Sequence, residues 1–337
     1  MAKTDVALLN PNMAATFPPP VMEARRWLDG VEFTSERPLI NVSQAAPVDP
    51  PPQSMRDAMA QAILNDDGTH LYGPVLGLPE LRSQVARDWS AAYGGEISDA
   101  NVAITSGCNQ AFAATIATLA APGDEVILPT PWYFNHKMWL DMGGIKSVPL
   151  ATDETLIPKA DDAAKLITSR TRAISLVSPN NPGGVEYPSG TLRSFFELCR
   201  DNGIVLIVDA TYRDFDSRVG APHDLFQAEW SDTLVQLYSF SKAYRLTGHR
   251  VGAMVASPDR LAEAEKFLDT VAICPNQLGQ RAGLWGMRNL GNWVGEQRSE
   301  ILDRRDAITE GFPALASKGW KLLGCGAYFA YVEHPFD

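Results

Sequence analysis

Short apolar runs alternate with helix-like segments through the middle of this chain. The runs lie at residues 102–105, 125–128, 146–149, 173–177, 204–208, 234–238 and 251–255. Between several of them the sequence predicts helices, for example over 110–119 and 192–202. Strands that are apolar on both faces are buried on both faces, which is typical of a mostly parallel sheet between two layers of helices. The sequence therefore predicts an α/β fold.

The segments on either side of this region differ in character. Residues 1–50 are irregular and rich in proline, with a short helix predicted at 23–28 and a short strand at 39–42. Helices are predicted over 54–64 and from 79 through 89. After residue 257 the pattern becomes helical, and two strands follow the helices. These later elements are predicted at 259–273, 278–287, 293–309, 320–323 and 327–332.

A chain of 337 residues is long enough for one large domain and a smaller one. We expect residues 1–50 to form an arm that packs on the small domain or on a partner subunit. We expect residues 51–260 to form the large domain, which would bind the ligand, and residues 261–337 to form a small α+β domain.

Composition excludes several classes of protein. The formal net charge of −11 argues against a nucleic-acid-binding surface. No apolar run reaches membrane-spanning length, and no signal peptide is recognisable. The four cysteines are far apart and form no CxxC pair, so neither a metal site nor a disulfide framework is predicted. We expect a cytoplasmic protein with reduced thiols.

Polar side chains cluster where the predicted strands end, and ligands bind at the carboxyl ends of parallel strands. Residues 106–108 (Ser-Gly-Cys) begin a predicted helix, whose free N–H groups and dipole favour an anion. Ser239 adds a hydroxyl and Arg250 adds a bidentate cation. Together these groups could bind a phosphate, although Ser106 alone is more often a simple helix cap.

Further groups at strand ends match the other parts of one ligand. Lys242 could condense with a carbonyl, and Asp209 needs a cation or hydrogen-bond donors as partners because it ends a strongly apolar strand. Tyr133 offers a flat ring, whereas Asn181 and Tyr212 offer hydrogen bonds. Alone, Lys242 would be read as a surface lysine, and Asp209 could equally be a turn residue at the end of a strand. A phosphate, a pyridinium nitrogen, a phenolic oxygen and an aldehyde occur together in pyridoxal 5′-phosphate (PLP).

With these residues, the sequence resembles the class I/II aminotransferases, which are PLP enzymes of fold type I similar to aspartate aminotransferase. The most specific motif is SFSKAYRLTGHRVG, with NNPGG, VDATY, TSGCNQ and YGPVLGLPELR in the family order. The resemblance runs from about residue 40 to the end of the chain. It implies a large domain with a mostly parallel seven-stranded sheet between helices, and a smaller α+β domain.

The resemblance also implies roles for the cofactor-facing residues. Lys242 would form the Schiff base with PLP and act as the general base and acid. Asp209 would pair with the pyridine nitrogen, and Tyr133 would stack on the ring. Asn181 and Tyr212 would donate hydrogen bonds to the phenolic oxygen. Lys242, Asp209 and Tyr212 are therefore the predicted catalytic residues.

The remaining implied roles concern the phosphate and a second subunit. His136 would support Asp209 from behind. Tyr72 would reach the phosphate of the neighbouring subunit, so a homodimer is expected. The residues assigned to the phosphate are Ser106, Gly107, Cys108, Ser239 and Arg250.

Three features depart from the family pattern. The loop with Asn181 continues as Pro182, Gly183 and Gly184, without the usual hydroxyl residue. Ala45 stands where relatives commonly have glycine. In the family, the arginine that binds the substrate α-carboxylate follows the strand that resembles residues 327–332. We therefore expect this chain to be a partial version of a longer protein.

The predicted activity is transfer of an amino group between an L-amino acid and a 2-oxo acid. Residues 269–274 contain no arginine, which disfavours aspartate and glutamate and favours aromatic or other neutral donors. The same cofactor residues would also serve a C–S lyase, a decarboxylase or an enzyme similar to aminocyclopropane-carboxylate synthase. An inactive PLP-binding fragment remains an alternative. A PLP-binding regulator is less favoured, because only about fifty residues precede the family pattern.

Overall fold

A seven-stranded sheet forms the centre of the molecule in the computed structural model, which describes residues 9–227 and 230–336. The strand order across the sheet is β1-β7-β6-β5-β4-β2-β3. The strands are β1 (Val102–Thr105), β2 (Glu125–Thr130), β3 (Lys146–Ala151), β4 (Thr171–Val177), β5 (Val205–Asp209), β6 (Leu234–Ser239) and β7 (Gly252–Val255).

The sheet is mostly parallel, as the sequence predicts. Strands β2 to β6 run parallel to one another, whereas β7 is antiparallel to both β6 and β1. Each predicted strand of the sheet is present within two residues of its expected bounds. The predicted α/β fold and its seven-stranded sheet are therefore confirmed.

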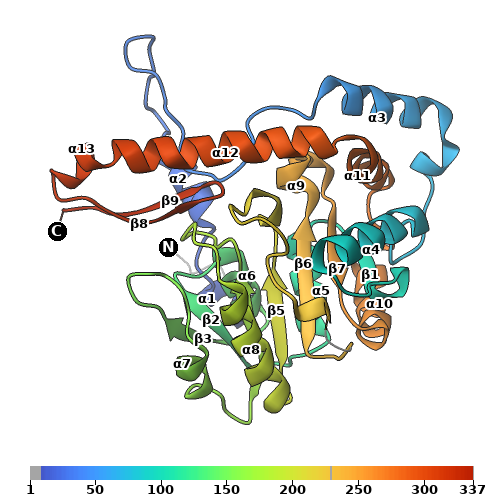
Figure 1. Cartoon of the computed structure of the whole chain (residues 1–337). Helices are drawn as coiled ribbons and strands as arrows, with labels where there is room; N and C mark the ends of the chain where they lie inside the picture. The colour runs from blue at the N-terminus through green and yellow to red at the C-terminus, as the bar shows by residue number, and fades with distance from the viewer. Residues whose placement is uncertain (1–8, 228–229, 337) are drawn as a thin grey trace, which may run out of the picture.

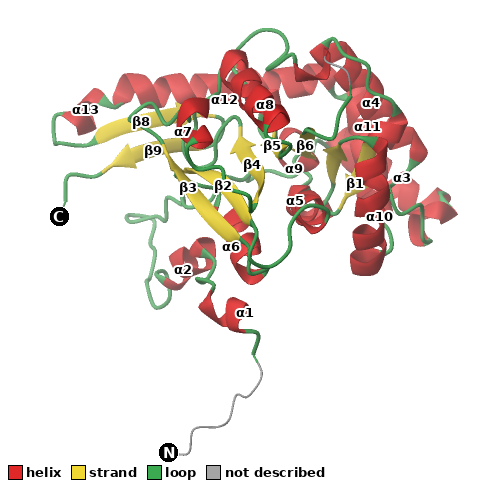
Figure 2. Cartoon of the chain, turned by 90° about the horizontal axis from the view of Figure 1, so that it is seen from below, coloured by secondary structure: helices red, strands yellow, loops and turns green. Residues whose placement is uncertain are grey.

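Helices cover both faces of the sheet (Figure 2). Alternate residues of β5 divide between two apolar clusters: Leu206 and Val208 face one, and Val205 and Ile207 face the other. The first cluster lies under α3 (Gln53–Asn65), α4 (Pro79–Tyr93), α8 (Ser189–Asp201) and α11 (Gln277–Asn289). The second lies under α5 (Cys108–Ala117), α6 (Phe134–Met142) and α10 (Pro258–Ala272). This double burial explains why β5 is apolar at consecutive positions.

Beyond the sheet, a long helix packs against a two-stranded hairpin, as Figure 1 shows in red. The helix is α12 (Gly291–Gly311), followed by the short α13 (Pro313–Ala316). The hairpin strands β8 (Lys321–Gly326) and β9 (Phe329–Glu333) pair antiparallel. Both strands were predicted. Ile301 of α12 and Ala327 at the hairpin turn pack with Phe215, which follows β5 in the chain.

The described part of the N-terminal arm holds two short helices, α1 (Pro11–Ala15) and α2 (Pro20–Arg26). Helix α1 packs against α6. The strand predicted at 39–42 is wrong, because this stretch is irregular and its apolar residues face outward. Ile40 and Val42 are 79% and 88% exposed, and an unpaired strand leaves its backbone groups without partners. In Figure 1 the blue segment between α2 and α3 projects from the body of the molecule.

Shorter elements complete the connections between these layers. None of the helices in the described ranges is long and apolar enough to cross a membrane. These connecting elements include η1 (Asp67–His70), η3 (Arg213–Phe215) and α9 (Phe240–Ala243).

Candidate active site

A cavity of about 670 Å³ opens at the carboxyl ends of three adjacent strands. Val177 ends β4, Asp209 ends β5 and Ser239 ends β6, and all three line the cavity. Its volume is in the range of small-molecule sites. The eight predicted residues that line it are Cys108, Tyr133, Asn181, Asp209, Tyr212, Ser239, Lys242 and Arg250. The structure therefore brings most of the predicted site together.

Lys242 lies on α9, the single helical turn that follows β6 directly. Its Nζ donates a hydrogen bond of 2.5 Å to the backbone oxygen of Ala45 and lies 5.8 Å from the ring centre of Tyr212. Burial, helped by the positive charge of Arg250, lowers the pKa of Lys242 from 10.5 to about 8. A neutral, nucleophilic amine is therefore accessible near physiological pH.

Asp209 is 3% exposed at the end of β5. Its Oδ1 accepts a hydrogen bond of 3.0 Å from the backbone N–H of Thr211, and its Oδ2 lies 3.3 Å from Nε2 of His136. Burial opposes ionisation, but His136 and Thr211 outweigh it, so the pKa of Asp209 lies below its usual value. A buried carboxylate on a cavity wall is suited to bind a cationic group. The structure thus places His136 behind Asp209, where the sequence predicted it.

Arg250 and Gly107 form a close contact at the start of α5. Gly107 has φ +85° and ψ 166°, and a Cβ there would lie 2.3 Å from Arg250 Nη2. Arg250 Nη1 donates to the Thr247 backbone oxygen at 3.1 Å and to Ser241 Oγ at 3.5 Å. A guanidinium beside the N-terminus of a ten-residue helix makes a positive region suited to an anion.

The other residues predicted for the phosphate take different places. The Ser106 backbone N–H donates to Gln110 Oε1 at 2.6 Å, and Ser106 is not among the cavity-lining residues. Cys108 is the first residue of α5 and lines the cavity, where burial raises the pKa of its thiol. Ser239 Oγ accepts from the Ser241 N–H at 3.2 Å and so caps α9.

Tyr133, Asn181 and Tyr212 come to the cavity from three different loops. Tyr133 OH accepts from Asn135 Nδ2 at 2.9 Å and donates to Asn109 Oδ1 at 3.3 Å. Tyr212 is 3% exposed, and burial raises the pKa of its hydroxyl well above the usual value. Both tyrosines are therefore neutral hydrogen-bond donors at physiological pH.

Tyr72 lies outside this cavity. It follows η1, is 79% exposed and is not a lining residue. The neighbouring Leu71 is 64% exposed. Within one chain, Tyr72 therefore makes no contribution to the cavity, and its predicted role in a partner's site stays a prediction.

Several lining residues lie outside the predicted set of cofactor-binding residues. Ser241 is one of them, and its place beside Arg250 and one residue before Lys242 could have indicated it. Thr211 lines the cavity two residues after Asp209. Residues 42–46 of the arm also line it, and Ala45 contacts Lys242 through its carbonyl group. No local pattern marks that arm contact, because 197 residues separate its two partners.

Comparison with known proteins agrees with this geometry. Residues 37–335 match the family described as aminotransferase class I and II, which is PLP-dependent. The chain is 30% identical to the aromatic aminotransferase ISS1 of Arabidopsis thaliana over 294 residues, which is 85% of this chain and 72% of that protein. It is 27% identical to a probable aspartate aminotransferase of Methanocaldococcus jannaschii, covering 81% of this chain and 73% of that one.

The fold agrees with solved structures as well. Aspartate aminotransferase from Thermus thermophilus with maleate superposes with a TM-score of 0.84 at 24% identity, covering 96% of this chain and 84% of that chain. A mutant of the same enzyme complexed with tryptophan gives a TM-score of 0.85 over the same shares. Because the family match spans most of the sequence, this chain belongs to the class I and II aminotransferases, and it has their fold.

Proposed function

We propose that this protein transfers an amino group between an L-amino acid and a 2-oxo acid, with PLP attached to Lys242. The observation that carries the proposal is the pairing of a buried amine of lowered pKa with a buried, ionised carboxylate in one cavity. The amine is Lys242 and the carboxylate is Asp209. Such perturbed titratable groups are typical of catalytic sites.

The residues fit the chemical groups of PLP. Arg250 and the N-terminus of α5 would hold the phosphate, and the absence of a Cβ at Gly107 leaves room for the guanidinium. Asp209 would hold a proton on the pyridine nitrogen, because its ionised carboxylate at the cavity wall attracts a cationic group. Lys242 would bind the aldehyde carbon.

The catalytic roles follow from these positions. PLP, when bound, accepts the electron pair released as the substrate Cα–H bond breaks. Lys242 Nζ would take the Cα proton as a general base and release it as a general acid. Asn181 and Tyr212 would donate to the phenolic oxygen, and the ring of Tyr133 would lie against the cofactor. His136 would keep Asp209 ionised.

The cavity wall favours an aromatic or other neutral amino acid as donor. Among the described lining residues, the only lysine and arginine side chains are Lys242 and Arg250, and both have cofactor roles in this proposal. Seven aromatic side chains line the same cavity: Trp132, Tyr133, Phe134, Tyr212, Tyr328, Phe329 and Tyr331. Aromatic rings bury well against one another, so a substrate ring would gain contact area there. The similarity to an aromatic aminotransferase supports the same choice.

A homodimer remains part of the proposal. Tyr72 and its chain neighbour Leu71 are 79% and 64% exposed, and Leu64 near the end of α3 is 74% exposed. Such a surface suits a second copy of the chain, which would carry Tyr72 to the neighbouring phosphate. In this proposal residues 51–260 bind the cofactor, and residues 261–337 form the smaller domain.

A screen of amino donors against several 2-oxo acids tests the function. We expect phenylalanine, tyrosine or tryptophan to be consumed only when a 2-oxo acid is present, with formation of the matching new amino acid. Consumption without a 2-oxo acid would instead favour a lyase, a decarboxylase or a reaction of the aminocyclopropane-carboxylate synthase kind. Faster turnover of aspartate than of every aromatic donor would contradict the proposed substrate class.

A further inference from the structure

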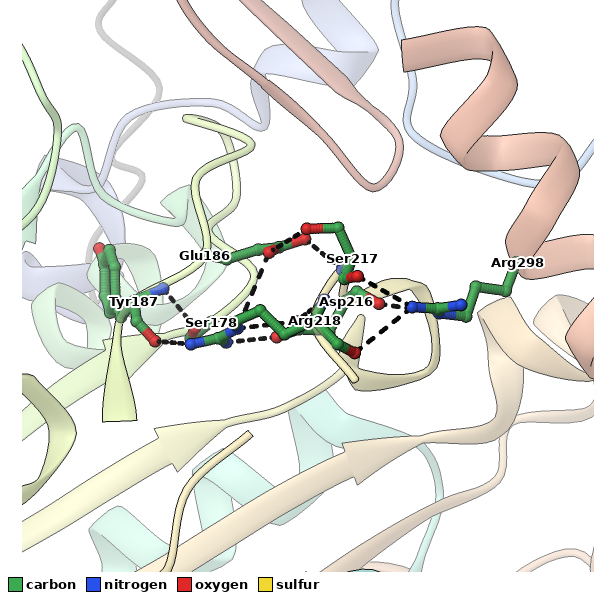
Figure 3. A network of polar contacts seen from close by, with 7 residues as sticks. All are labelled: Ser178, Glu186, Tyr187, Asp216, Ser217, Arg218 and Arg298. Atoms are coloured by element: carbon green, nitrogen blue, oxygen red, sulfur yellow. Dashed lines mark hydrogen bonds and ion pairs between the residues drawn. The ribbon is translucent and has the colours of Figure 1, made fainter. Parts of the chain in front are cut away.

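A polar network joins α12 to two loops of the site (Figure 3). One loop, residues 178–187, carries Asn181. The other, residues 210–218, carries Tyr212. The members of the network are Ser178, Glu186, Tyr187, Asp216, Ser217, Arg218 and Arg298.

Arg298 contacts the second loop through its backbone. Nε donates to the Asp216 carbonyl at 2.8 Å, and Nη2 donates to those of Ser217 at 3.1 Å and Arg218 at 3.3 Å. Figure 3 shows the guanidinium of Arg298 reaching from α12 to these three carbonyl groups. A planar guanidinium fits several acceptors at fixed spacing, which a lysine ammonium does less well. The contact therefore fixes the path of the backbone at residues 216–218.

This backbone segment is tied to Tyr212. The Phe215 N–H donates to the Tyr212 carbonyl at 2.9 Å within η3, which ends at the residue before Asp216. Ile301, three residues after Arg298 on α12, belongs to one apolar cluster with Tyr212 and Phe215. Helix α12 thus contacts the Tyr212 loop through a polar and an apolar side chain that lie on the same face.

The same segment holds the loop that carries Asn181. Ser217 donates through N–H at 2.6 Å and through Oγ at 2.7 Å to the two oxygens of Glu186. Arg218 Nη1 donates to the Tyr187 carbonyl at 2.7 Å. The Tyr187 N–H in turn donates to Ser178 Oγ at 3.0 Å, which closes the base of the loop. Both loops therefore depend on the position of residues 216–218.

Gln297, the residue before Arg298 on α12, contacts the segment that carries Lys242. Gln297 accepts a hydrogen bond from Arg245, which lies three residues after Lys242. The Arg245 guanidinium also lies 5.3 Å from the ring centre of Trp293 on α12. Two consecutive residues of one helix thus contact the Lys242 segment and the Tyr212 segment.

We propose that Arg298 is a positioning residue: it sets the distance of Tyr212 and Asn181 from Lys242 by holding residues 216–218 against α12. The inference rests on the proposed function to the extent that Tyr212 and Asn181 bind the phenolic oxygen of PLP. Arg298 itself is not a lining residue of the cavity. It acts through the two loops.

Replacing Arg298 with Gln should change a spectroscopic property of the site. Hydrogen bonds from Tyr212 and Asn181 would stabilise a negative charge on the phenolic oxygen. If the hydrogen bonds from Tyr212 and Asn181 weaken, the phenolic oxygen holds a neighbouring proton more tightly. The midpoint of the pH titration followed by visible absorbance therefore rises. We expect a rise of about 0.5–1 pH unit, consistent with partial loss of a charge-assisted hydrogen bond, and PLP affinity lower by about 5-fold or more.

The experiment compares Arg298→Gln with Arg304→Gln, which removes the same charge from the same helix at a position where the side chain is 62% exposed. The PLP-loaded proteins are titrated by visible absorbance, and PLP affinity is measured by equilibrium dialysis. Hydrogen exchange is followed by mass spectrometry in the PLP-free proteins. Exchange in Arg298→Gln should accelerate over residues 178–187 and 213–218 but not over residues 240–250. Arg304→Gln should match the parent protein in every measurement.

A lower melting temperature without a shift of the absorbance midpoint would overturn the proposal, since a merely structural residue would behave in that way. Exchange that accelerates in the Tyr212 loop alone would also overturn it. If Arg298→Gln does not fold, Ser217→Ala removes one contact of the same network and should give a smaller shift in the same direction. If the parent protein gives no visible band with PLP, the proposed function fails, and the exchange measurement still decides whether Arg298 couples the two loops.

Discussion

Nε2 of His136 lies 3.3 Å from Oδ2 of Asp209, and both side chains are only 3% exposed. Phe112 stacks on the His136 ring with 3.8 Å between ring centres, which fixes the orientation of the imidazole. A buried carboxylate is costly unless it has partners. The histidine therefore allows Asp209 to remain charged at the wall of the cavity, where a cofactor cation would meet it.

Asp209→Asn should retain PLP but lose most of the activity. The amide keeps the size of the side chain and removes the charge that would hold a proton on the pyridine nitrogen. We expect kcat to fall by more than about 100-fold, the scale of a lost acid–base contribution. His136→Asn leaves the carboxylate in place and should lose less. An Asp209→Asn variant with near-normal kcat would contradict the assigned pairing.

Lys242→Ala should abolish covalent attachment of PLP and reduce turnover by more than about 100-fold. Its amine is the nucleophile and the proton carrier in the proposed reaction. The check is the protein mass after borohydride reduction in the presence of PLP, which should increase for the parent protein only. Lys137→Ala is a suitable control, because that lysine pairs with Asp141 on α6. If Lys242→Ala gains as much mass as the parent protein, another residue is modified.

Gly107→Ala should weaken both the fold and PLP binding. The new Cβ would lie 2.3 Å from Arg250 Nη2, and the backbone angles at Gly107 strongly favour glycine. We expect the free energy of unfolding to fall by about 1–3 kcal/mol. Gly190→Ala is the matched control, since no atom lies within 4 Å of a Cβ there. Denaturant unfolding and PLP titration measure the two effects, and equal behaviour of both variants would refute the close contact.

The stability of the PLP-free protein should depend on pH through Lys242. Its pKa is about 8 in the folded protein and 10.5 in the reference state, so the unfolded chain binds more protons between these values. Stability attributable to this group therefore rises as pH increases from about 8 to about 10.5. Lys242→Met removes the buried charge and should stabilise the PLP-free protein at pH 7, by at most about 3 kcal/mol.

The difference between Lys242→Met and the parent should shrink as pH approaches 10.5. Thermal unfolding of both proteins from pH 7 upward measures it. A difference that stays constant over this range would indicate that the methionine acts through packing alone.

Much of the fold follows from local patterns in the sequence. The strands of the sheet could be predicted because consecutive apolar residues mark burial on both faces. The direction of β7 could not, since a doubly buried strand has the same pattern whether it is parallel or antiparallel. The strand expected at 39–42 is absent from the structure for a different reason. The residues have strand propensity, but no neighbouring strand pairs with them.

In the candidate site too, some features follow from the local sequence and others depend on the tertiary structure. The sequence by itself determined the groups that lie close along the chain, such as the helix start at Gly107 and the segment from Ser239 to Arg250, because short backbone segments have few conformations. Only the tertiary structure decided that Ala45 contacts Lys242, that His136 faces Asp209, and that Arg298 holds residues 216–218. These contacts join segments 197, 73 and 82 positions apart, and their geometry depends on how whole helices and strands pack, which no local pattern records.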